Sequence, residues 1–286
     1  MTVIEYLQDL QTRNKIIDLI RENIFLYQGI NTDKKIQDLT GVLYNKFVEE
    51  CVQNNQYISL SNKSITNINE IYQTLIFDLR GLIKKEYTRA DIEDIVIDHR
   101  GKLIHELTNN VFSDKTRQIY IPCAEYTPEF QQKILKLPNR KLPEPILDIG
   151  CGKHHGLINS LKESGYHIVY GIDQYTSSEP SVICCNWFEY EFEKRTFGTV
   201  LAHMSFTNHF RRSIILDDDK RGMYQDKYFE ILESLRAGGL FIYTPAVKQV
   251  EKELDTTNFK VTYHRNTKDE NLDTVTIERS SLGRIH

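Results

Sequence analysis

Along the first 112 residues, apolar side chains recur every three or four positions, which is the spacing of one face of an α-helix. One stripe consists of Ile36, Leu39, Leu43, Phe47 and Cys51, and another of Ile65, Ile68, Ile71, Leu75, Leu79 and Leu82. No proline interrupts residues 1–121, which favours helices over a sheet. We therefore predict a helical N-terminal domain over residues 1–119.

The end of this region predicts two further helices. Thr88 precedes Asp91 by three residues, the spacing of a capping box, and the helix that it opens carries Ile92. A separate helix is expected to carry Leu103 and Val111. We expect the domain to be a cap that recognises substrate, although such stripes are equally those of a plain helical core.

Prolines then gather over residues 120–145, which hold five of the seven in the chain. This composition predicts a linker over residues 120–144, wrapped around one short helix at residues 130–137. Tyr120 and Tyr126 lie on the linker, where either ring could close over a bound ligand.

From residue 145 to 286, strand-like runs alternate with helical ones. The expected strands are "PILDIG", "HIVYGID", "SVICCNW", "FGTVLAHMSF" and "LFIYTPAV", and the expected helices include "GLINSLKES" and "MYQDKYFEILESLRAGG". This alternation predicts an α/β domain with a doubly wound parallel sheet. "NFKVTYHRN" and "DTVTIERS" predict a terminal antiparallel hairpin, which brings the sheet to seven strands.

The turn after the first strand, "DIGCG", is the expected ligand site. Gly150 and Gly152, on either side of Cys151, let a ligand lie against the backbone. The dinucleotide pattern GxGxxG requires a third glycine where this chain has His155. Asp148 would repel a pyrophosphate but attracts an ammonium or sulfonium group. Asp148 therefore favours S-adenosyl-L-methionine over a dinucleotide.

Four more residues are candidates for this cofactor. Asp173 ends the second strand, where a carboxylate can accept hydrogen bonds from both ribose hydroxyls, and Gln174 follows it. Asn186 and Trp187 follow the third strand, where an amide could read the adenine edge and an indole could stack on its face. The alternatives are a solvated turn aspartate and a core tryptophan.

Residues 145–280 resemble a class I, Rossmann-like S-adenosylmethionine-dependent methyltransferase. "ILDIGCG" resembles the first motif of that family, "GID" its acidic strand end, and "FGTVLAHMSF" and "LESLRAGGLFIYTP" its fourth and fifth strands. The family commonly has glycine at the position of His154, and often has aspartate where this chain has Cys185 and Asn186. His154 and His155 are therefore expected either to shape the site or to be exposed at the start of a helix.

The segment after the fourth strand, "AHMSFTNHFRRS", supplies the candidate catalytic residues. His209 is expected at the pocket mouth as a general base or as an orienting residue, with Asn208 beside it and His203 nearer the cofactor. The alternative is that these side chains satisfy local backbone or pack in the core.

Composition and charge bear on the substrate class, the state of the cysteines and the location of the protein. A net charge of −4 and a pI near 6.2 argue against a broad nucleic-acid surface. The five cysteines form no CxxC pair and no zinc spacing, so we predict no metal site and reduced thiols. No apolar run approaches the roughly 20 residues that span a bilayer. We expect a soluble, cytoplasmic protein.

The predicted function is methyl transfer to a small-molecule oxygen or nitrogen acceptor, including amino-acid-derived compounds and secondary metabolites. Alternatives are a protein, peptide or structured-RNA methyltransferase, or a non-catalytic module that keeps the cofactor fold. The sequence does not indicate an oligomeric state.

Overall fold

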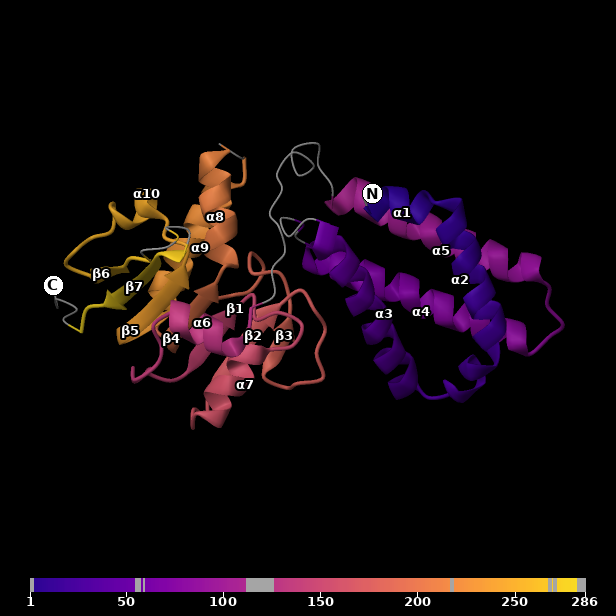
Figure 1. Ribbon diagram of the computed structural model, residues 1–286, viewed down its shortest axis with the longest axis horizontal. Helices are drawn as coiled ribbons and strands as arrows, with labels where there is room; N and C mark the ends of the chain where they lie inside the picture. The colour runs from indigo at the N-terminus through magenta and orange to yellow at the C-terminus, as the bar shows by residue number, and fades with distance from the viewer. Residues whose placement is uncertain are drawn as a thin grey trace. The chain divides into compact units, whose positions relative to one another are not determined.

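The computed structural model describes residues 3–54, 58, 60–111, 126–216, 219–266, 269 and 272–281. The chain divides into two compact units, Met1–Cys123 and Ala124–His286. Figure 1 shows the first unit, in indigo to magenta, as a set of helices and the second as a sheet covered by helices. Residues 112–125, which include Tyr120 and the start of the expected linker, lie outside the described residues.

All of the secondary structure among the described residues of the first unit is helical. Its elements are α1 (Val3–Gln8), α2 (Leu10–Asn23), the 3₁₀ helix η1 (Ile24–Gly29), α3 (Asp33–Asn54), α4 (Asn62–Ile83), α5 (Arg89–Glu106) and the π-helical segment η2 (Leu107–Val111). Buried Ile17, Leu79, Leu82, Ile92 and Val96 form a core where α2, α4 and α5 meet. Among the described helices of the chain, none has the length and apolar character needed to cross a bilayer.

The capping box at the start of α5 is confirmed. The Asp91 backbone N–H donates to Thr88 Oγ1 at 3.4 Å, and the Thr88 N–H donates to Asp91 Oδ2 at 2.7 Å. The two separate helices predicted after Thr88 are wrong, because α5 continues through Gly101 and runs directly into η2. An added Cβ at Gly101 would meet no atom within 4 Å, so this glycine lies on the open side of a continuous helix.

The second unit is built on one seven-stranded sheet with the order β3-β2-β1-β4-β5-β7-β6. Its strands are β1 (Ile146–Ile149), β2 (Val169–Asp173), β3 (Val182–Cys184), β4 (Phe197–His203), β5 (Leu235–Thr244), β6 (Phe259–His264) and β7 (Thr274–Arg279). The first five strands pair in parallel, and β7 is antiparallel to both β5 and β6. The predicted α/β sheet with its terminal antiparallel hairpin is confirmed.

Helices cover both faces of the sheet. They are α6 (Pro128–Ile134), α7 (Gly156–Glu163), α8 (Phe206–Ile215), α9 (Arg221–Ser234) and the short α10 (Lys248–Glu251). Ile146 of β1 packs into a core with Leu157 and Leu161 of α7. Its neighbour Leu147 packs on the opposite face, in a core that includes Phe210 of α8. The alternation of side chains along β1 therefore supplies both layers of a doubly wound fold.

Several helices of the second unit differ from the predictions. The linker helix is α6, which begins at Pro128 because Thr127 accepts the Phe130 N–H at 3.3 Å. The helix expected to end at a pair of glycines stops at Ser234, and the next residues already belong to β5. Residues 206–215, which carry two of the candidate catalytic residues, form a helix that the sequence pattern did not assign.

Candidate functional site

The candidate site begins at the turn that follows β1. Gly150 and Gly152 have φ angles of +74° and +73°, a backbone region that favours glycine. A Cβ at Gly150 would lie 2.5 Å from the Cβ of Ser205, so close packing excludes a side chain there. A Cβ at Gly152 would meet no atom within 4 Å. Gly150 is thus required by the fold, whereas Gly152 leaves open space beside its backbone.

Asp173, at the end of β2, fixes this turn. Its Oδ2 accepts the Gly152 N–H at 2.8 Å, and its Oδ1 accepts the Tyr175 N–H at 3.3 Å. Burial raises the pKa of Asp173, and these backbone donors act against that rise because they favour the ionised form. The structure therefore brings together Gly152 and Asp173, two residues that the sequence separates by 21 positions.

Asp148 lies on β1 beside this arrangement and is only 2% exposed. Its Oδ2 is buried and has no hydrogen-bond partner among the described residues. Burial and the neighbouring Asp173 raise the pKa of Asp148 to about 7. A buried carboxyl group that lacks a partner and lies near a second carboxylate is stabilised by a cation. The pair therefore makes this end of the sheet suitable for a positively charged group.

Cys151 separates the two glycines but does not face the same space. It is buried in the core with α7, and its backbone N–H donates to Ile172 O at 3.3 Å. Burial raises the pKa of its thiol, which is therefore a packing group in this position. Its contribution to a ligand site is limited to backbone.

The segment after β3 lies against Asp173. The Cys185 N–H donates to Asp173 O at 2.8 Å, and Cys184 Sγ lies 3.4 Å from Gln174 O as a weak donor. Asn186 is 8% exposed, and its Oδ1 accepts the Phe188 N–H at 2.9 Å, which holds a local turn. The predicted cofactor residues Gln174 and Asn186 therefore come from adjoining strand ends.

Trp187 packs within an aromatic group rather than standing free. Its ring meets Phe206 and His209 edge-on, with centroid separations of 6.1 and 5.0 Å. Its indole Nε1 is buried without a hydrogen-bond partner among the described residues. This environment agrees with the alternative of a core tryptophan, and stacking on adenine stays a prediction.

His203 ends β4 and is 6% exposed. Its ring makes edge contacts with Tyr126 and Phe130, at centroid separations of 4.8 and 6.1 Å. Neither ring nitrogen has a hydrogen-bond partner within the described chain, and burial lowers the pKa of His203 to about 4. Asp148 pairs with Leu201 in the parallel register. His203 is therefore level with Gly150 at the same end of the sheet.

His209 and Asn208 lie in the first turns of α8. His209 is 2% exposed, and burial lowers its pKa to about 3. A general base has to touch its acceptor, and this ring presents almost no surface to one. The structure thus places His209 inside the fold instead of at a pocket mouth, while Asn208 is half-buried.

Ser205 and Phe130 were not among the predicted site residues. Ser205 donates its hydroxyl to Ile149 O and lies against Gly150, so it locks the β4–α8 turn onto the end of β1. The only feature of the sequence that could indicate the role of Ser205 is a small residue near the end of the fourth predicted strand. Phe130 comes from α6 and stacks on Tyr126 at a centroid separation of 5.3 Å.

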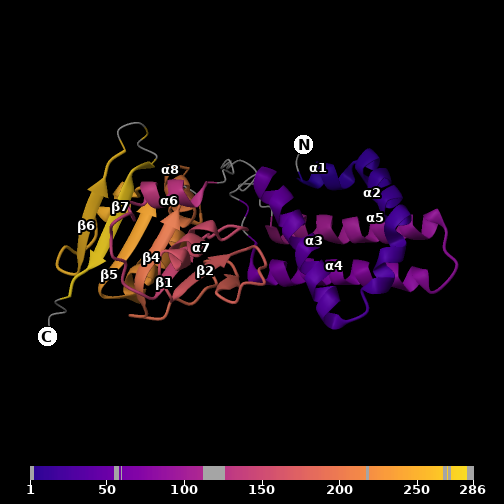
Figure 2. The same cartoon turned by 60° about the horizontal axis from the view of Figure 1, so that its bottom comes forward.

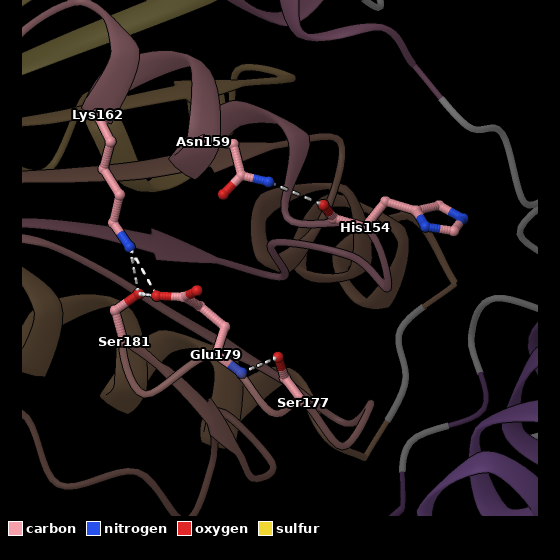
Figure 3. A network of polar contacts seen from close by, with 6 residues as sticks. All are labelled: His154, Asn159, Lys162, Ser177, Glu179 and Ser181. Carbon is pink, nitrogen blue, oxygen red and sulfur yellow. Dashed lines mark hydrogen bonds and ion pairs between the residues drawn. The ribbon is translucent and has the colours of Figure 1, made fainter.

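A polar network fixes the connection after β2 onto α7 (Figure 3). Lys162 Nζ donates to Glu179 Oε1 and Ser181 Oγ, both at 2.8 Å, and the Ser181 hydroxyl donates to the same Glu179 oxygen at 2.9 Å. The Glu179 N–H donates to Ser177 Oγ at 3.0 Å. This network restrains the loop that follows Asp173.

His154 and His155 precede α7. The His154 carbonyl accepts from Asn159 Nδ2 at 3.4 Å, and its exposed ring projects away from the network in Figure 3. His155 is the N-cap residue of α7, with a left-handed backbone at φ +51°. The position of His154 agrees with the expected alternative of an exposed residue at the start of a helix.

A comparison with solved structures finds methyltransferases that match about half of this chain. A putative S-adenosylmethionine-dependent methyltransferase from Listeria monocytogenes matches 52% of this chain and 98% of its own, at 14% identity and a TM-score of 0.37. The N-methyltransferase NodS from Bradyrhizobium japonicum, in complex with S-adenosyl-L-homocysteine, matches 54% and 87%, at 12% identity and a TM-score of 0.37. A 16S rRNA methyltransferase from T. thermophilus, in complex with AdoMet and guanosine, matches 53% and 39%, at 15% identity and a TM-score of 0.37.

All three are described as methyltransferases, the family that the sequence motifs resemble. No family model matches the sequence, and a search of curated proteins gave no match. These likenesses concern the fold at low similarity.

Proposed function

We propose that this chain is an S-adenosylmethionine-dependent methyltransferase that holds its cofactor at the carboxyl ends of β1 and β2. The observation that carries the proposal is Asp148, a buried carboxyl group whose Oδ2 has no partner among the described residues. The methionine part of the cofactor bears an ammonium group beside the sulfonium. Either cation would supply the missing partner and favour the ionised carboxylate.

The geometry of the turn supports the remaining cofactor assignments that we propose. Gly152 has open space where a side chain would be, so the ligand would lie against its backbone. Asp173 accepts backbone N–H groups from Gly152, Tyr175 and Gln174, and a carboxylate has about four acceptor sites, so it can also accept a ribose hydroxyl. Asn186 and Trp187 are assigned to the adenine, because they come from the strand end that adjoins Asp173.

A dinucleotide fits this site poorly. Its pyrophosphate would need a helix N-terminus with free N–H groups and no nearby negative charge. Here Asp148 and Asp173 lie at the turn, and His155 stands where the third glycine of the dinucleotide pattern would be. The charge of the site therefore favours the sulfonium cofactor.

The cofactor supplies the activated methyl group, and the protein positions the acceptor. Burial holds the pKa values of His203 and His209 at about 4 and about 3, so both rings are neutral near pH 7. Bases this weak abstract a proton poorly, whereas a neutral ring both donates and accepts hydrogen bonds. We assign His203 and Asn208 to orienting the acceptor, and His209 to holding α8 against Trp187.

The acceptor proposed is a small molecule with an oxygen or nitrogen nucleophile, used in the cytoplasm. The net charge of −4 makes nucleic acid the weaker alternative. The four cysteines of the described residues, Cys51, Cys151, Cys184 and Cys185, are in the thiol form, in keeping with a reducing compartment. The helical first unit is proposed to recognise the acceptor.

The test is to incubate the full chain with cell extract and a methyl-deuterated cofactor, and to search for labelled products by mass spectrometry. The proposal expects a labelled small molecule that is absent with Asp173→Ala and present with Asp226→Ala, an exposed aspartate on α9. Labelled RNA or peptide would support the alternative acceptors. Cofactor binding without any labelled product would favour the non-catalytic module and overturn the enzyme.

A further inference from the structure

The first unit contains a groove of about 680 Å³ along the α4–α5 pair. Figure 2 shows these two helices running side by side, and the element contacts agree. The volume is within the range of small-molecule sites, which is roughly 300–1,000 Å³. None of the residues of the candidate methyltransferase site lines it.

The feature that distinguishes this groove is Glu106, the last residue of α5. Its side chain is among the lining groups, although the residue is only 5% exposed. Its Oε2 accepts the side-chain amide of Asn67 at 2.9 Å and that of Asn110 at 2.9 Å. Its Oε1 is buried and has no hydrogen-bond partner among the described residues. One half of the carboxylate is thus firmly held, and the other half lacks a donor.

Local backbone structure produces this arrangement. Asn67 comes from α4, 39 residues earlier, and Asn110 from the π-helical segment η2 that follows Glu106 directly. Both amides orient their NH₂ groups toward the carboxylate, so its position is set before any ligand arrives.

The charges around the groove favour a cation. Three carboxylates, Glu70, Asp98 and Glu106, line it together with two lysines, Lys63 and Lys102. Lys102 Nζ pairs with Asp98 Oδ2 at 2.6 Å. Of the other carboxylates and lysines that line the groove, two are carboxylates, Glu70 and Glu106, and one is a lysine, Lys63. Among the described residues no group of three or more His, Cys, Asp or Glu side chains is placed to hold a metal ion. Glu106 Oε1 lacks a hydrogen-bond donor among the described residues, and an organic cation with N–H groups supplies both a donor and a positive charge.

We propose that this groove binds a small organic molecule with a protonated primary amine, which donates to Glu106 Oε1. An ammonium has three N–H donors and a positive charge, and charge-assisted hydrogen bonds of this kind are among the strongest in proteins. Because Oε1 has almost no exposed surface, the side chains around it shift to admit the amine. The proposal is independent of methyl transfer.

The test uses the full chain and putrescine, with butanediol as an uncharged probe of the same length. Calorimetric titration is expected to give saturable binding of the diamine and none of the diol. Glu106→Gln is expected to weaken diamine binding by about tenfold or more, as for the loss of a hydrogen bond to a charged group. Glu86→Gln, at an exposed site in the α4–α5 turn, is the matched control and leaves binding unchanged.

A second variant keeps the test decisive if Glu106→Gln does not fold, as checked by circular dichroism. Gly101 lines the groove, and an added Cβ there meets no atom within 4 Å. Gly101→Leu is therefore expected to fold, to fill part of the groove and to weaken diamine binding severalfold. Equal binding of diamine and diol, no diamine binding, or full affinity in a folded Glu106→Gln or Gly101→Leu variant would overturn the proposal.

Discussion

At the scale of single residues, the two carboxyl groups at the ends of β1 and β2 differ in what they accept. Asp173 receives backbone donors on both oxygens, whereas Asp148 has one buried oxygen without a partner in the described structure. Asp173 is therefore set to hold the turn and a neutral hydroxyl, and Asp148 to meet a cation. Two predictions separate these roles.

The variant Asp148→Asn tests whether the raised pKa of Asp148 makes the free energy of unfolding depend on pH. An unfolded aspartate has a pKa near 3.9, and burial with Asp173 raises that of folded Asp148 to about 7. Between these values the unfolded chain loses the proton and the folded chain keeps it. The free energy of unfolding therefore falls as pH rises from about 4 to about 7. Urea unfolding should show Asp148→Asn gaining stability over wild type as pH rises, with a constant difference above about pH 7.

The same carboxyl predicts how cofactor affinity depends on pH. A bound cation favours ionised Asp148, so wild-type affinity should rise with pH below about pH 7 and level off above it. Asp148→Asn should bind more weakly and lack this rise. Calorimetry at several pH values measures both. A wild-type profile that is flat, or one that the variant retains, would contradict the assignment.

Asp173→Ala should weaken cofactor binding by about 1.5–3 kcal/mol, roughly ten- to hundredfold, because it removes hydrogen bonds to a charged group. It also frees the Gly152 N–H. Asp226→Ala, on the exposed side of α9, is the control for loss of an aspartate. Equal affinity of Asp173→Ala and the control, measured by calorimetry, would remove Asp173 from the site.

Much of the candidate site could be predicted from the sequence, because strand ends and glycine turns have recognisable local sequence patterns. Asp148, Gly150, Gly152 and Asp173 follow from one turn motif and from the rule that parallel strands end at one edge. The burial of His209 was not predictable, because its sequence context did not identify α8 or the face that α8 turns to Trp187.

At the scale of elements, the β1–α7 turn combines one glycine needed for packing with one that borders open space. Gly150→Ala should destabilise the fold strongly, because its Cβ would lie 2.5 Å from that of Ser205. Gly152→Ala should lose about 1–2 kcal/mol from its left-handed backbone alone. It should also lose cofactor affinity, since the methyl group enters the proposed site.

Urea unfolding and calorimetry on the two glycine variants measure these effects. The expected pattern is a larger stability loss for Gly150→Ala and a binding defect in a still-folded Gly152→Ala. Normal cofactor affinity in Gly152→Ala would mean that the ligand does not approach this turn.

Tertiary pairing explains why some element boundaries were missed. The residues "LRAGG" read as the end of a helix, since glycine commonly ends helices. In the structure Leu235 pairs with Phe197 of β4, and the register then shifts before Thr199 pairs with Leu240. Strand pairing with a partner distant in sequence therefore outweighed the local capping signal.

At the scale of the whole molecule, all of the proposed cofactor residues belong to one unit, Ala124–His286. We therefore predict that a fragment of residues 124–286 binds S-adenosylhomocysteine with an affinity within about twofold of the full chain, a difference of about 0.4 kcal/mol. Calorimetry on both proteins, with circular dichroism to verify folding, makes the comparison. A folded fragment that fails to bind would show that the first unit completes the cofactor site.

In the helical unit, the core could be predicted from the sequence but the Glu106 site could not. Its core was predictable because the stripes of apolar residues are regular, as with Ile68 and Leu79. The Glu106 site was not, because it requires the pairing of α4 with α5 and a local π-helical register. A glutamate at the end of an amphipathic helix has no sequence signature of its own.

Residues 148–152 and Asp173 are proposed to bind a cationic sulfur nucleoside. The most direct measurement of this binding is calorimetric titration of the full chain with S-adenosylmethionine and, separately, with NAD. The account predicts saturable one-to-one binding of S-adenosylmethionine, weakened in Asp148→Asn and Asp173→Ala, and no heat of binding with NAD. Binding of NAD instead, or no binding of S-adenosylmethionine by the folded chain, would contradict it.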